Sequence, residues 1–337
     1  MKILITGAAG GIGSTLGYNL NKNGHELILV DNLRNGYIEN LTIDGEEFGS
    51  FHNIDINSED FHELVLSELP DAIVHLAAIT SLPDCEVNYR ECIRCNVEGT
   101  ASVLGAARAS GIERVIFAST SAVYENTILK EGGFLESDEI NPRLFYSLSK
   151  KMSEEICKSF SENYGMNIVT LRFFNVFGPR QDIHRKSPPL INYLTRELVN
   201  GESPILHSDG NQSRDYVHVN DVVDLIEKCL NGTEIKDYIT LNVSTCTLTS
   251  VHEILESVKS GINLDKDVPA IYRNPDRLWD SYGDLFEGKY PLKKSVVEKE
   301  TLKKSLGNNY LSKKTLNWNP KSKIGDLIKS MVSTMKI

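Results

Sequence analysis

Short apolar runs alternate with longer amphipathic stretches along the first half of the chain. The runs are rich in β-branched residues and have the length of buried strands, whereas the stretches between them follow the 3.6-residue period of a helix. Five strands are predicted, at residues 2–7, 26–32, 72–78, 114–120 and 167–174. Three helices are predicted between them, at residues 12–24, 87–110 and 146–165. This alternation predicts an α/β fold with a parallel, doubly wound sheet and right-handed crossovers.

The alternation becomes irregular after residue 175. Glycine and proline punctuate residues 175–189, and helical periodicity returns in short segments at residues 190–201 and 220–231. Residues 262–315 are polar and irregular, and within them the mixed charges of residues 293–304 predict a solvated helix or loop. We therefore expect a smaller C-terminal α/β lobe that covers the carboxyl edge of the sheet and that the chain enters more than once.

Composition excludes several classes of partner. The 337 residues are 40% hydrophobic and 24% charged, which is ordinary for a globular enzyme. A formal net charge of −10 argues against nucleic acid, whose binding needs a basic face. No apolar run approaches the roughly 20 residues that span a bilayer, and the N-terminal segment lacks the apolar region of a signal peptide. We expect a cytoplasmic protein with no nucleic-acid or membrane partner.

Six cysteines raise the question of a metal or redox site. Cys92 and Cys95 form a CxxC, but no second pair follows at the spacing of a zinc site, and the pair lies in a helical pattern. A structural or incidental role is favoured over a metal or redox role, and the thiols are expected to be reduced. No metal site is predicted.

A glycine-rich turn provides the first candidate chemistry. The first predicted strand runs into GAAGGIG, residues 7–13, and then into a helix. Glycines permit a tight turn and let backbone N–H groups approach a pyrophosphate at the positive end of the helix. Asp31 follows at the end of the second strand, 24 residues after Gly7. A carboxylate there accepts the hydroxyls of an adenosine ribose and repels a 2′-phosphate, which favours NAD over NADP; the alternative is a turn without a ligand.

Tyr146 and Lys150 provide the second candidate chemistry. They are four residues apart at the start of a predicted helix and so share one face. A free tyrosine, with a pKa of ~10, is a poor base at neutral pH. A nearby ammonium and the positive nicotinamide ring both stabilise the phenolate, so we expect the pKa of Tyr146 to be lowered. An exposed surface pair is the alternative, but the glycine turn and the hydroxyls that end strand 114–120 favour proton transfer.

In this order and spacing, the segments resemble the extended short-chain dehydrogenase/reductase family. The branch that fits best contains the NAD-dependent nucleotide-sugar epimerases and dehydratases, such as the UDP-glucose and UDP-N-acetylglucosamine 4-epimerases. The resemblance covers nearly the whole chain and includes HLAA, AST, LRFFNVFGPRQ, RDYVHVNDV and LNWNPK. We expect a Rossmann-type NAD-binding domain and a substrate-binding lobe. The domain is assigned to residues 1–174 with part of 215–262, and the lobe mainly to residues 175–214 and 263–337.

The resemblance implies roles for individual residues. Tyr146 would be the base, Lys150 its activator, and Thr120 the hydroxyl that bridges the sugar oxygen to Tyr146. The implied NAD contacts are Gly7, Gly10, Gly11, Ile12, Gly13, Asp31, Asn32, Asp55, Ile56, Leu76, Ala77, Ala78, Asn96, Tyr146, Lys150 and Phe174. The implied contacts of the nucleotide-diphosphate sugar are Thr80, Ser81, Ser121, Asn175, Arg214 and Arg273. Guanidinium groups suit phosphate geometry, and Arg277 is the alternative to Arg273.

The residues after Thr120 distinguish between reactions. Dehydratases of this branch carry Asp-Glu there and its decarboxylases keep the Glu, whereas this chain has Ser121 and Ala122, which are no general acids or bases. Epimerisation at C4 needs reversible hydride transfer, the tyrosine and rotation of a 4-keto sugar, so a 4-epimerase is predicted. One alternative is a 4,6-dehydratase, for example of an N-acetylhexosamine nucleotide, with Glu125 as a carboxylate. A non-catalytic NAD-binding regulator is another, although such proteins typically lose the tyrosine.

Two predicted helices carry apolar stripes. The stripes consist of Val97, Val103, Leu104 and Ala107 on residues 87–110, and of Met152, Ile156 and Phe160 on residues 146–164. Stripes at this spacing usually belong to the core of the same chain. In the resembling family the same helices form a four-helix bundle across a dyad, which implies a homodimer.

Overall fold

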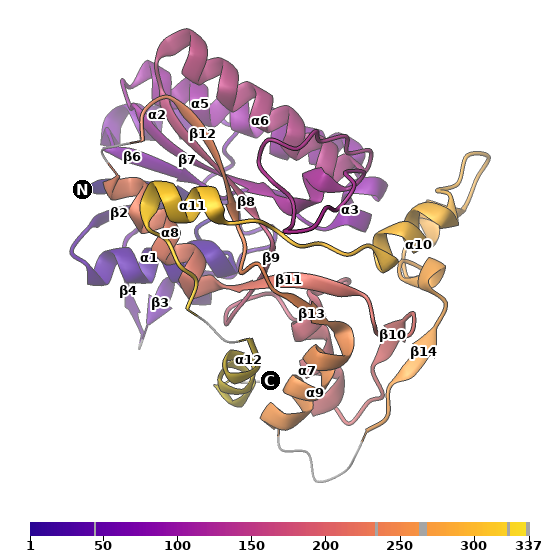
Figure 1. Cartoon of the computed structure of the whole chain (residues 1–337). Helices are drawn as coiled ribbons and strands as arrows, with labels where there is room; N and C mark the ends of the chain where they lie inside the picture. The colour runs from indigo at the N-terminus through magenta and orange to yellow at the C-terminus, as the bar shows by residue number, and fades with distance from the viewer. Residues whose placement is uncertain (44, 233–234, 263–267, 322–323, 335–337) are drawn as a thin grey trace.

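A seven-stranded parallel sheet forms the centre of the protein (Figure 1). The structure is a computed structural model that describes residues 1–43, 45–232, 235–262, 268–321 and 324–334. In sheet order, the strands are β12 (Tyr238–Val243), β8 (Asn167–Phe173), β7 (Arg114–Thr120), β6 (Ala72–His75), β1 (Lys2–Thr6), β2 (Glu26–Asp31) and β5 (Ser50–Asn53). All neighbours pair in parallel, which confirms the predicted α/β fold with its doubly wound sheet. The five predicted strands occupy the middle, and the two edge strands were not predicted.

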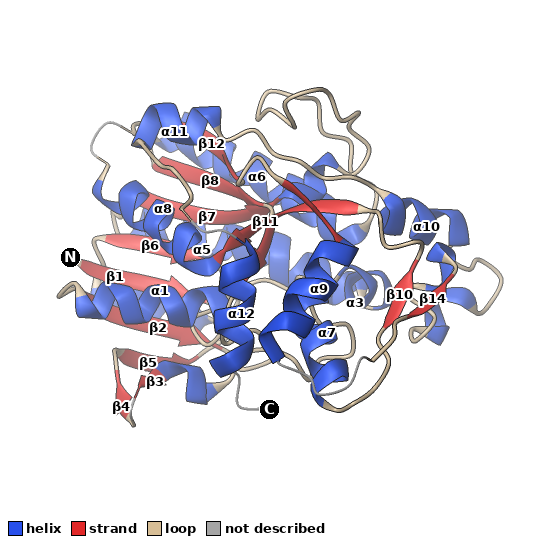
Figure 2. Cartoon of the chain, turned by 60° about the horizontal axis from the view of Figure 1, so that its bottom comes forward, coloured by secondary structure: helices blue, strands red, loops and turns tan. Residues whose placement is uncertain are grey.

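Helices cover both faces of this sheet (Figure 2). On one face lie α1 (Gly11–Lys22) and α8 (Val219–Asn231), and on the other lie α2 (Glu59–Glu68), α5 (Gly99–Ala109) and α6 (Phe145–Tyr164). Successive side chains of a strand point to opposite faces. Ile3 and Ile5 therefore pack in the core of the first face, and Leu4 packs in the core of the second. Because both faces are buried, the central strands read as continuous apolar runs.

The single helix predicted at residues 87–110 is divided in the structure. It consists of α4 (Tyr89–Ile93), a π-helical turn (Arg94–Glu98) and α5, and the short helix α3 (Leu82–Val87) precedes it. Asn96 lies in the π-helical turn, where its side chain accepts the N–H of Ile79 at 2.8 Å and donates to the carbonyl of Ile79 at 3.0 Å. The turn therefore holds the loop that follows β6.

A smaller lobe packs beyond the carboxyl edge of the sheet. Its helices are α7 (Leu190–Val199), α9 (Val251–Ile262) and α12 (Ile324–Thr334), and they share a core that includes Leu194, Ile254 and Ile328. Its strands are β9 (Asn175–Phe177), β11 (Ser213–His218) and β13 (Leu248–Ser250) in one sheet, and β10 (Ile205–His207) and β14 (Ile271–Arg273) in another. A short hairpin of β3 (Thr42–Ile43) and β4 (Glu46–Glu47) lies outside both lobes' sheets.

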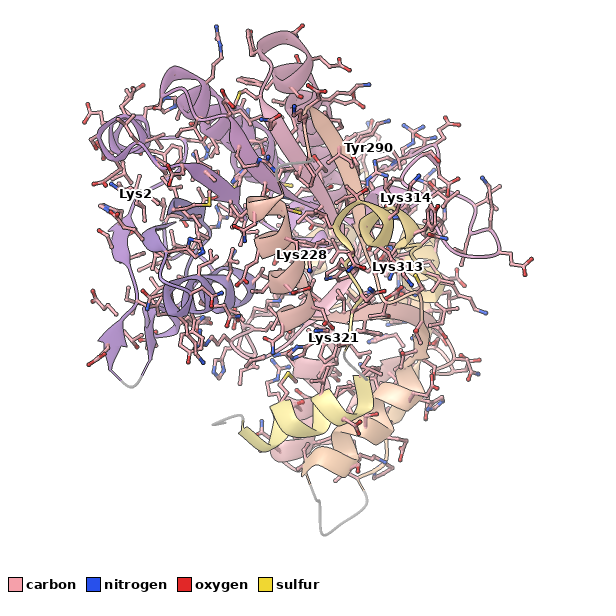
Figure 3. All side chains as sticks on the ribbon, turned by 60° about the vertical axis from the view of Figure 1, so that its left-hand side comes forward. Lys2, Lys228, Tyr290, Lys313, Lys314 and Lys321 are labelled. Carbon is pink, nitrogen blue, oxygen red and sulfur yellow. The ribbon has the colours of Figure 1, made fainter. Side chains whose placement is uncertain are left out.

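The stretch expected to be irregular contains two helices. These are α10 (Lys294–Leu302), within the charged segment, and α11 (Tyr310–Leu316). Leu311 and Leu316 pack against the core between the sheet and α8, whereas Lys313 and Lys314 project into solvent (Figure 3). The chain therefore returns to the main sheet near its C-terminal end. In the described ranges, no helix combines the length and apolarity that crossing a membrane requires.

Candidate active site

A cavity of ≈ 290 Å³ opens where β1, β2, β6 and β7 end. Ligands of open α/β sheets bind outside the carboxyl ends of the strands, which is where this cavity lies. Most of the predicted cofactor contacts line it. They are Gly7, Gly10, Gly11, Ile12, Gly13, Asp31, Asn32, Asp55, Ile56, Leu76, Ala77, Ala78, Tyr146 and Lys150. Of the predicted substrate contacts, Thr80 and Ser81 line it as well.

Glycine is required at two positions of the turn between β1 and α1. Gly7 has a φ of +70°, and a Cβ built there would lie 2.7 Å from the backbone nitrogen of Ala77. A Cβ on Gly13 would lie 2.2 Å from the carbonyl oxygen of Gly7. Gly10 is the N-cap of α1 and offers no side chain to its first N–H groups. The positive end of α1 therefore faces the cavity, as the binding of a pyrophosphate requires.

Asp31 lies at the end of β2 beside this turn. Its carboxylate accepts the N–H of Ala9 at 3.0 Å and that of Leu33 at 2.8 Å. Burial raises the pKa of Asp31, and these two hydrogen bonds act in the opposite direction. A carboxylate oxygen has more than one lone pair, so Asp31 can still accept ribose hydroxyls. The turn, the helix end and this carboxylate together fit a dinucleotide.

Thr120, Tyr146 and Lys150 meet at the other end of the cavity. Thr120 ends β7, Tyr146 is the second residue of α6, and Lys150 lies one turn further along this helix. All three are buried, and the Thr120 hydroxyl accepts the N–H of Ala122 at 3.2 Å. The ammonium of Lys150 donates to the carbonyl of Ala118 at 2.9 Å and lies over the ring of Phe117.

Burial governs the protonation of this pair. It raises the pKa of Tyr146 to about 12, although the Thr120 hydroxyl and the charge of Arg185 act to lower it. It also lowers the pKa of Lys150 to about 8. The expected lowering of the tyrosine pKa by Lys150 is thus wrong for the protein by itself, because a low-dielectric surrounding favours the neutral form of both groups.

Other predicted contacts lie outside the cavity wall. Asn96 is occupied with Ile79, and Phe174 packs on Tyr124 while its neighbour Phe173 lines the cavity. The remaining predicted residues that do not line it are Thr120, Ser121, Asn175, Arg214 and Arg273. Thr120 nevertheless influences the site, because its hydroxyl acts to lower the pKa of Tyr146.

The two arginines expected to clamp a diphosphate have other surroundings. Arg214 donates to the carbonyls of Glu300 at 2.8 Å and of Thr301 at 3.2 Å, at the C-terminal end of α10. Arg273 is exposed on β14, and Arg277 forms an exposed ion pair with Asp280 at 3.1 Å. In this structure, Arg214 therefore holds α10 against β11 and does not point its charge into the cavity.

Like Arg34, Arg185 lines the cavity, and the sequence reasoning missed both residues. Its Nε donates to the carbonyl of Ser187 at 2.7 Å, and burial lowers its pKa. Asp84 of α3 lines the same end. The sequence contained one signal for Arg185. The loop 175–189, which carries this residue, follows a predicted central strand and must therefore begin at the carboxyl edge of the sheet.

The carboxylate of Glu125 is directed at the start of α6. One of its carboxylate oxygens accepts the N–H groups of Arg143 at 3.0 Å and Leu144 at 3.1 Å, just before α6 begins. Glu86 accepts the next N–H, from Phe145, at 2.6 Å. These two carboxylates satisfy the N-terminal end of the helix that carries Tyr146.

Cysteines also surround the tyrosine. Cys85 and Cys92 are buried and pack in one apolar cluster with Tyr146, and Cys95 lines the cavity. All three are free thiols. Within the described ranges, no group of three or more histidine, cysteine, aspartate or glutamate residues has an arrangement that could hold a metal ion.

Comparison with known proteins gives a consistent result. Residues 3–244 match the model of the "NAD dependent epimerase/dehydratase family". A Methanocaldococcus jannaschii protein that carries the provisional name UDP-glucose 4-epimerase is 31% identical over 99% of this chain and 98% of its own length. UDP-glucuronic acid decarboxylase 3 of Arabidopsis thaliana is 27% identical over 82% of this chain and 79% of its own. The crystal structure of the Thermotoga maritima UDP-glucose 4-epimerase with UDP-glucose superposes with a TM-score of 0.83, at 28% identity, over 98% of this chain and 97% of that one.

Proposed function

The chain belongs to the NAD dependent epimerase/dehydratase family, and we propose that it is a nucleotide-sugar 4-epimerase that works through a transient 4-keto sugar. One observation carries the proposal. Tyr146 and Lys150 line the same cavity as the glycine turn and Asp31, and the Thr120 hydroxyl acts to lower the pKa of Tyr146. UDP-hexoses are the first substrates to test, because the relatives named above act on UDP-sugars.

NAD, the cofactor of this family, fits the cavity. Residues of the glycine turn would hold its pyrophosphate, and Asp31 would hold its adenosine ribose. When bound, NAD supplies a reversible acceptor of hydride from the sugar carbon.

Proton transfer at the sugar hydroxyl is the part of the chemistry that the chain's own residues perform. Tyr146 takes the proton of the C4 hydroxyl and later returns one to the 4-keto oxygen, and Thr120 orients this oxygen by a hydrogen bond. A buried phenol with a pKa of about 12 needs a compensating positive charge to do this near neutral pH. Lys150 lies one turn away, and Arg185 already acts in this direction.

The carboxylates around the site favour epimerisation over elimination. Dehydration requires a general base for the C5 proton and an acid for the departing hydroxyl. Ser121 and Ala122 carry no carboxylate, and Glu125 accepts two backbone N–H groups. Asp84 lines the substrate end of the cavity, and it is the observation that keeps a 4,6-dehydratase as the second candidate. A catalytically silent NAD-binding protein would not need the buried Tyr146, Lys150 and Thr120 together.

The experiment is to incubate the purified protein with UDP-glucose and UDP-N-acetylglucosamine and to follow the sugar by proton NMR. We expect inversion at C4 with retention of the C6 hydroxyl. A 6-deoxy-4-keto product would establish the dehydratase instead. Failure of UDP-, GDP- and dTDP-sugars to react, with NAD bound, would support the regulator.

We further propose that the protein is a homodimer formed through α5 and α6. These helices lie side by side on one face of the sheet (Figure 1). Val103, Leu104 and Ala107 are buried in the core of their own chain, so they leave no apolar stripe on α5. On α6, Met152 is 41% exposed, which makes this helix the stronger candidate for the contact.

A further inference from the structure

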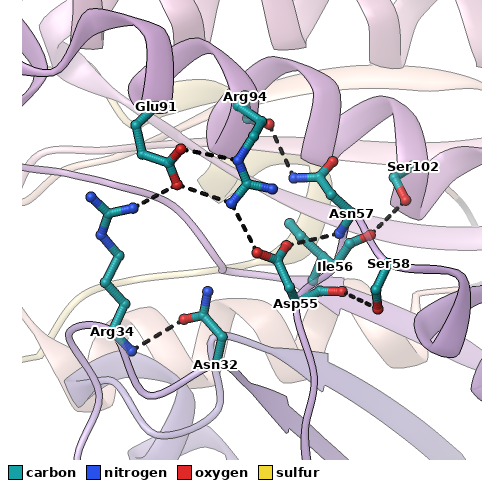
Figure 4. Close-up of polar contacts among 9 residues, drawn as sticks. All are labelled: Asn32, Arg34, Asp55, Ile56, Asn57, Ser58, Glu91, Arg94 and Ser102. Atoms are coloured by element: carbon teal, nitrogen blue, oxygen red, sulfur yellow. Dashed lines mark hydrogen bonds and ion pairs between the residues drawn. The ribbon is translucent and has the colours of Figure 1, made fainter.

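Four charged residues form a continuous chain of ion pairs at the adenosine end of the cavity (Figure 4). Arg34 donates to Glu91 at 2.6 Å, Glu91 accepts two hydrogen bonds from Arg94 at 2.9 and 3.0 Å, and Arg94 donates to Asp55 at 2.9 Å. The chain links the loop after β2, the helix α4 with its π-helical turn, and the loop after β5.

Glu91 is the centre of this chain. One of its oxygens accepts from both arginines, and the other accepts from Arg94. The hydrogen bonds from Arg94 lower the pKa of Glu91, and the charge of Arg34 acts in the same direction. Burial would raise the pKa of Asp55, but the hydrogen bonds from Arg94 and Asn57 and the charge of Arg94 together lower it. Glu91 is therefore ionised at neutral pH.

Arg34 occupies a place where a guanidinium affects the choice of dinucleotide. It follows Asp31 by three residues, and Arg34, Asp31 and Glu91 all line the cavity. A carboxylate at the end of the second strand suits a free ribose, whereas an arginine in this region accommodates a 2′-phosphate. The chain thus carries Asp31, which favours NAD, and Arg34, which favours NADP. Among the described residues, Glu91 is the carboxylate that lies within ion-pair distance of Arg34.

We propose that Glu91 is a cofactor-selectivity residue. By holding the guanidinium of Arg34 in an ion pair, it withholds this group from a 2′-phosphate and so favours NAD over NADP. The inference depends on dinucleotide binding and not on which sugar is converted. Glu91 also adds a negative charge to the cavity wall that Asp31 lines, which acts against the phosphate in the same sense.

The test is calorimetric measurement of the dissociation constants of NAD and NADP without any sugar substrate. In Glu91→Gln, the ratio Kd(NADP)/Kd(NAD) should fall about tenfold, because Arg34 becomes available to the phosphate. In Glu91→Gln combined with Arg34→Met, the ratio should return towards that of the unmodified protein. Raised salt should reduce the effect, since the contact is partly exposed.

The ratio separates selectivity from mere loosening of the site. If Glu91 only braced the loops, its loss would weaken both dinucleotides alike and leave the ratio unchanged, and this result would overturn the proposal. Glu98→Gln is the matched control, because Glu98 is exposed on the adjoining turn, lies outside the cavity wall and carries the same charge. It should leave the ratio within about a factor of two. If Glu91→Gln does not fold, Glu91→Asp shortens the side chain and should lower the ratio in the same direction.

Discussion

The environment of Tyr146 and Lys150 works against the charged form of each residue. Burial moves their pKa values in opposite directions, up to about 12 for the phenol and down to about 8 for the ammonium. The shift of the Tyr146 pKa lowers the stability of the folded protein at high pH, where the phenolate would form. The shift of the Lys150 pKa lowers this stability near neutral pH, where the ammonium is charged. Residues that carry a reaction are often kept in such environments at a cost in stability.

Lys150→Met should therefore stabilise the protein at pH 7 while it abolishes turnover. The lowered pKa of Lys150 corresponds to a cost of about 3 kcal/mol for keeping this buried group charged. Because the folded state releases this proton near pH 8 and the unfolded chain only above pH 10, the unmodified protein recovers about 2 kcal/mol between pH 7 and 9.5. Urea unfolding at both pH values measures the difference. The explanation would be contradicted if the difference in unfolding free energy between Lys150→Met and the unmodified protein did not become smaller from pH 7 to pH 9.5.

Tyr146→Phe should reduce turnover of the accepted sugar nucleotide by about 10²–10⁴-fold, because the proton acceptor is removed. NAD affinity should change little, since the glycine turn and Asp31 are untouched. NMR turnover assays and calorimetry measure the two effects. Tyr164→Phe is the matched control: Tyr164 belongs to the same helix, is 50% exposed, and its ring lies against Arg108. Undiminished turnover in Tyr146→Phe would remove the basis of the proposed mechanism.

At the scale of elements, the start of α6 sets the position of Tyr146. The N-cap of this helix, Leu144, provides no side-chain hydrogen bond. Glu125 and Glu86 accept the N–H groups at this end instead, and their negative charges complement the helix dipole. Glu125 is thus a positioning residue in this structure, whereas the sequence alone left it open as an acid or base.

Two substitutions of Glu125 distinguish a positioning role of this residue from a role in proton transfer. Glu125→Gln keeps an oxygen that accepts N–H groups, so turnover should fall by less than about fivefold. Glu125→Ala removes the acceptor and should lower stability by ~1 kcal/mol and turnover considerably more. Thermal unfolding and NMR assays measure the two effects. If both variants were equally inactive while stability was unchanged, Glu125 would be a proton-transfer group.

Elements with a clear local sequence pattern were predicted, and elements without one were missed. The central strands are apolar runs because both faces are buried, and they were predicted within a few residues. β5 is the four residues SFHN at the edge of the sheet, which have no apolar run to reveal them. The π-helical turn at Arg94–Glu98 was read as ordinary helix, because its residues have no unusual propensity. The contact of Asn96 with Ile79 accounts for the turn, and this contact joins residues from separate elements.

At the scale of the whole molecule, long-range polar contacts hold the segments of the smaller lobe together and join this lobe to the end of β12. Asn175 donates to the carbonyl of Asp215 at 2.9 Å, and Arg214 holds the end of α10. The carboxylate of Asp215 accepts from Ser244 and Thr245, at 2.7 and 2.8 Å, after β12 has left the main sheet. The residues expected to bind a diphosphate thus connect the lobe's segments in this structure.

The proposed homodimer can be tested at this scale. Light scattering after size-exclusion chromatography at micromolar concentration should give twice the chain mass of 37.6 kDa. Met152→Asp should shift the protein to monomer, because it places a charge in the apolar contact. Leu302→Asp is the control, since Leu302 is similarly exposed, at 44%, on the distant α10. A monomer of the unmodified protein would refute the dimer.

Local chemistry in the chain was sufficient for the five central strands, the glycine turn, Asp31 and the Tyr146–Lys150 pair. Each depends on residues within one or two helical turns, or on a strand and the helix that follows it. The protonation of that pair, the contacts of Arg214 and the choice of Arg185 for the cavity wall depended on the complete fold. Burial and contacts between residues distant in the sequence set these properties, and the local sequence pattern does not reveal them.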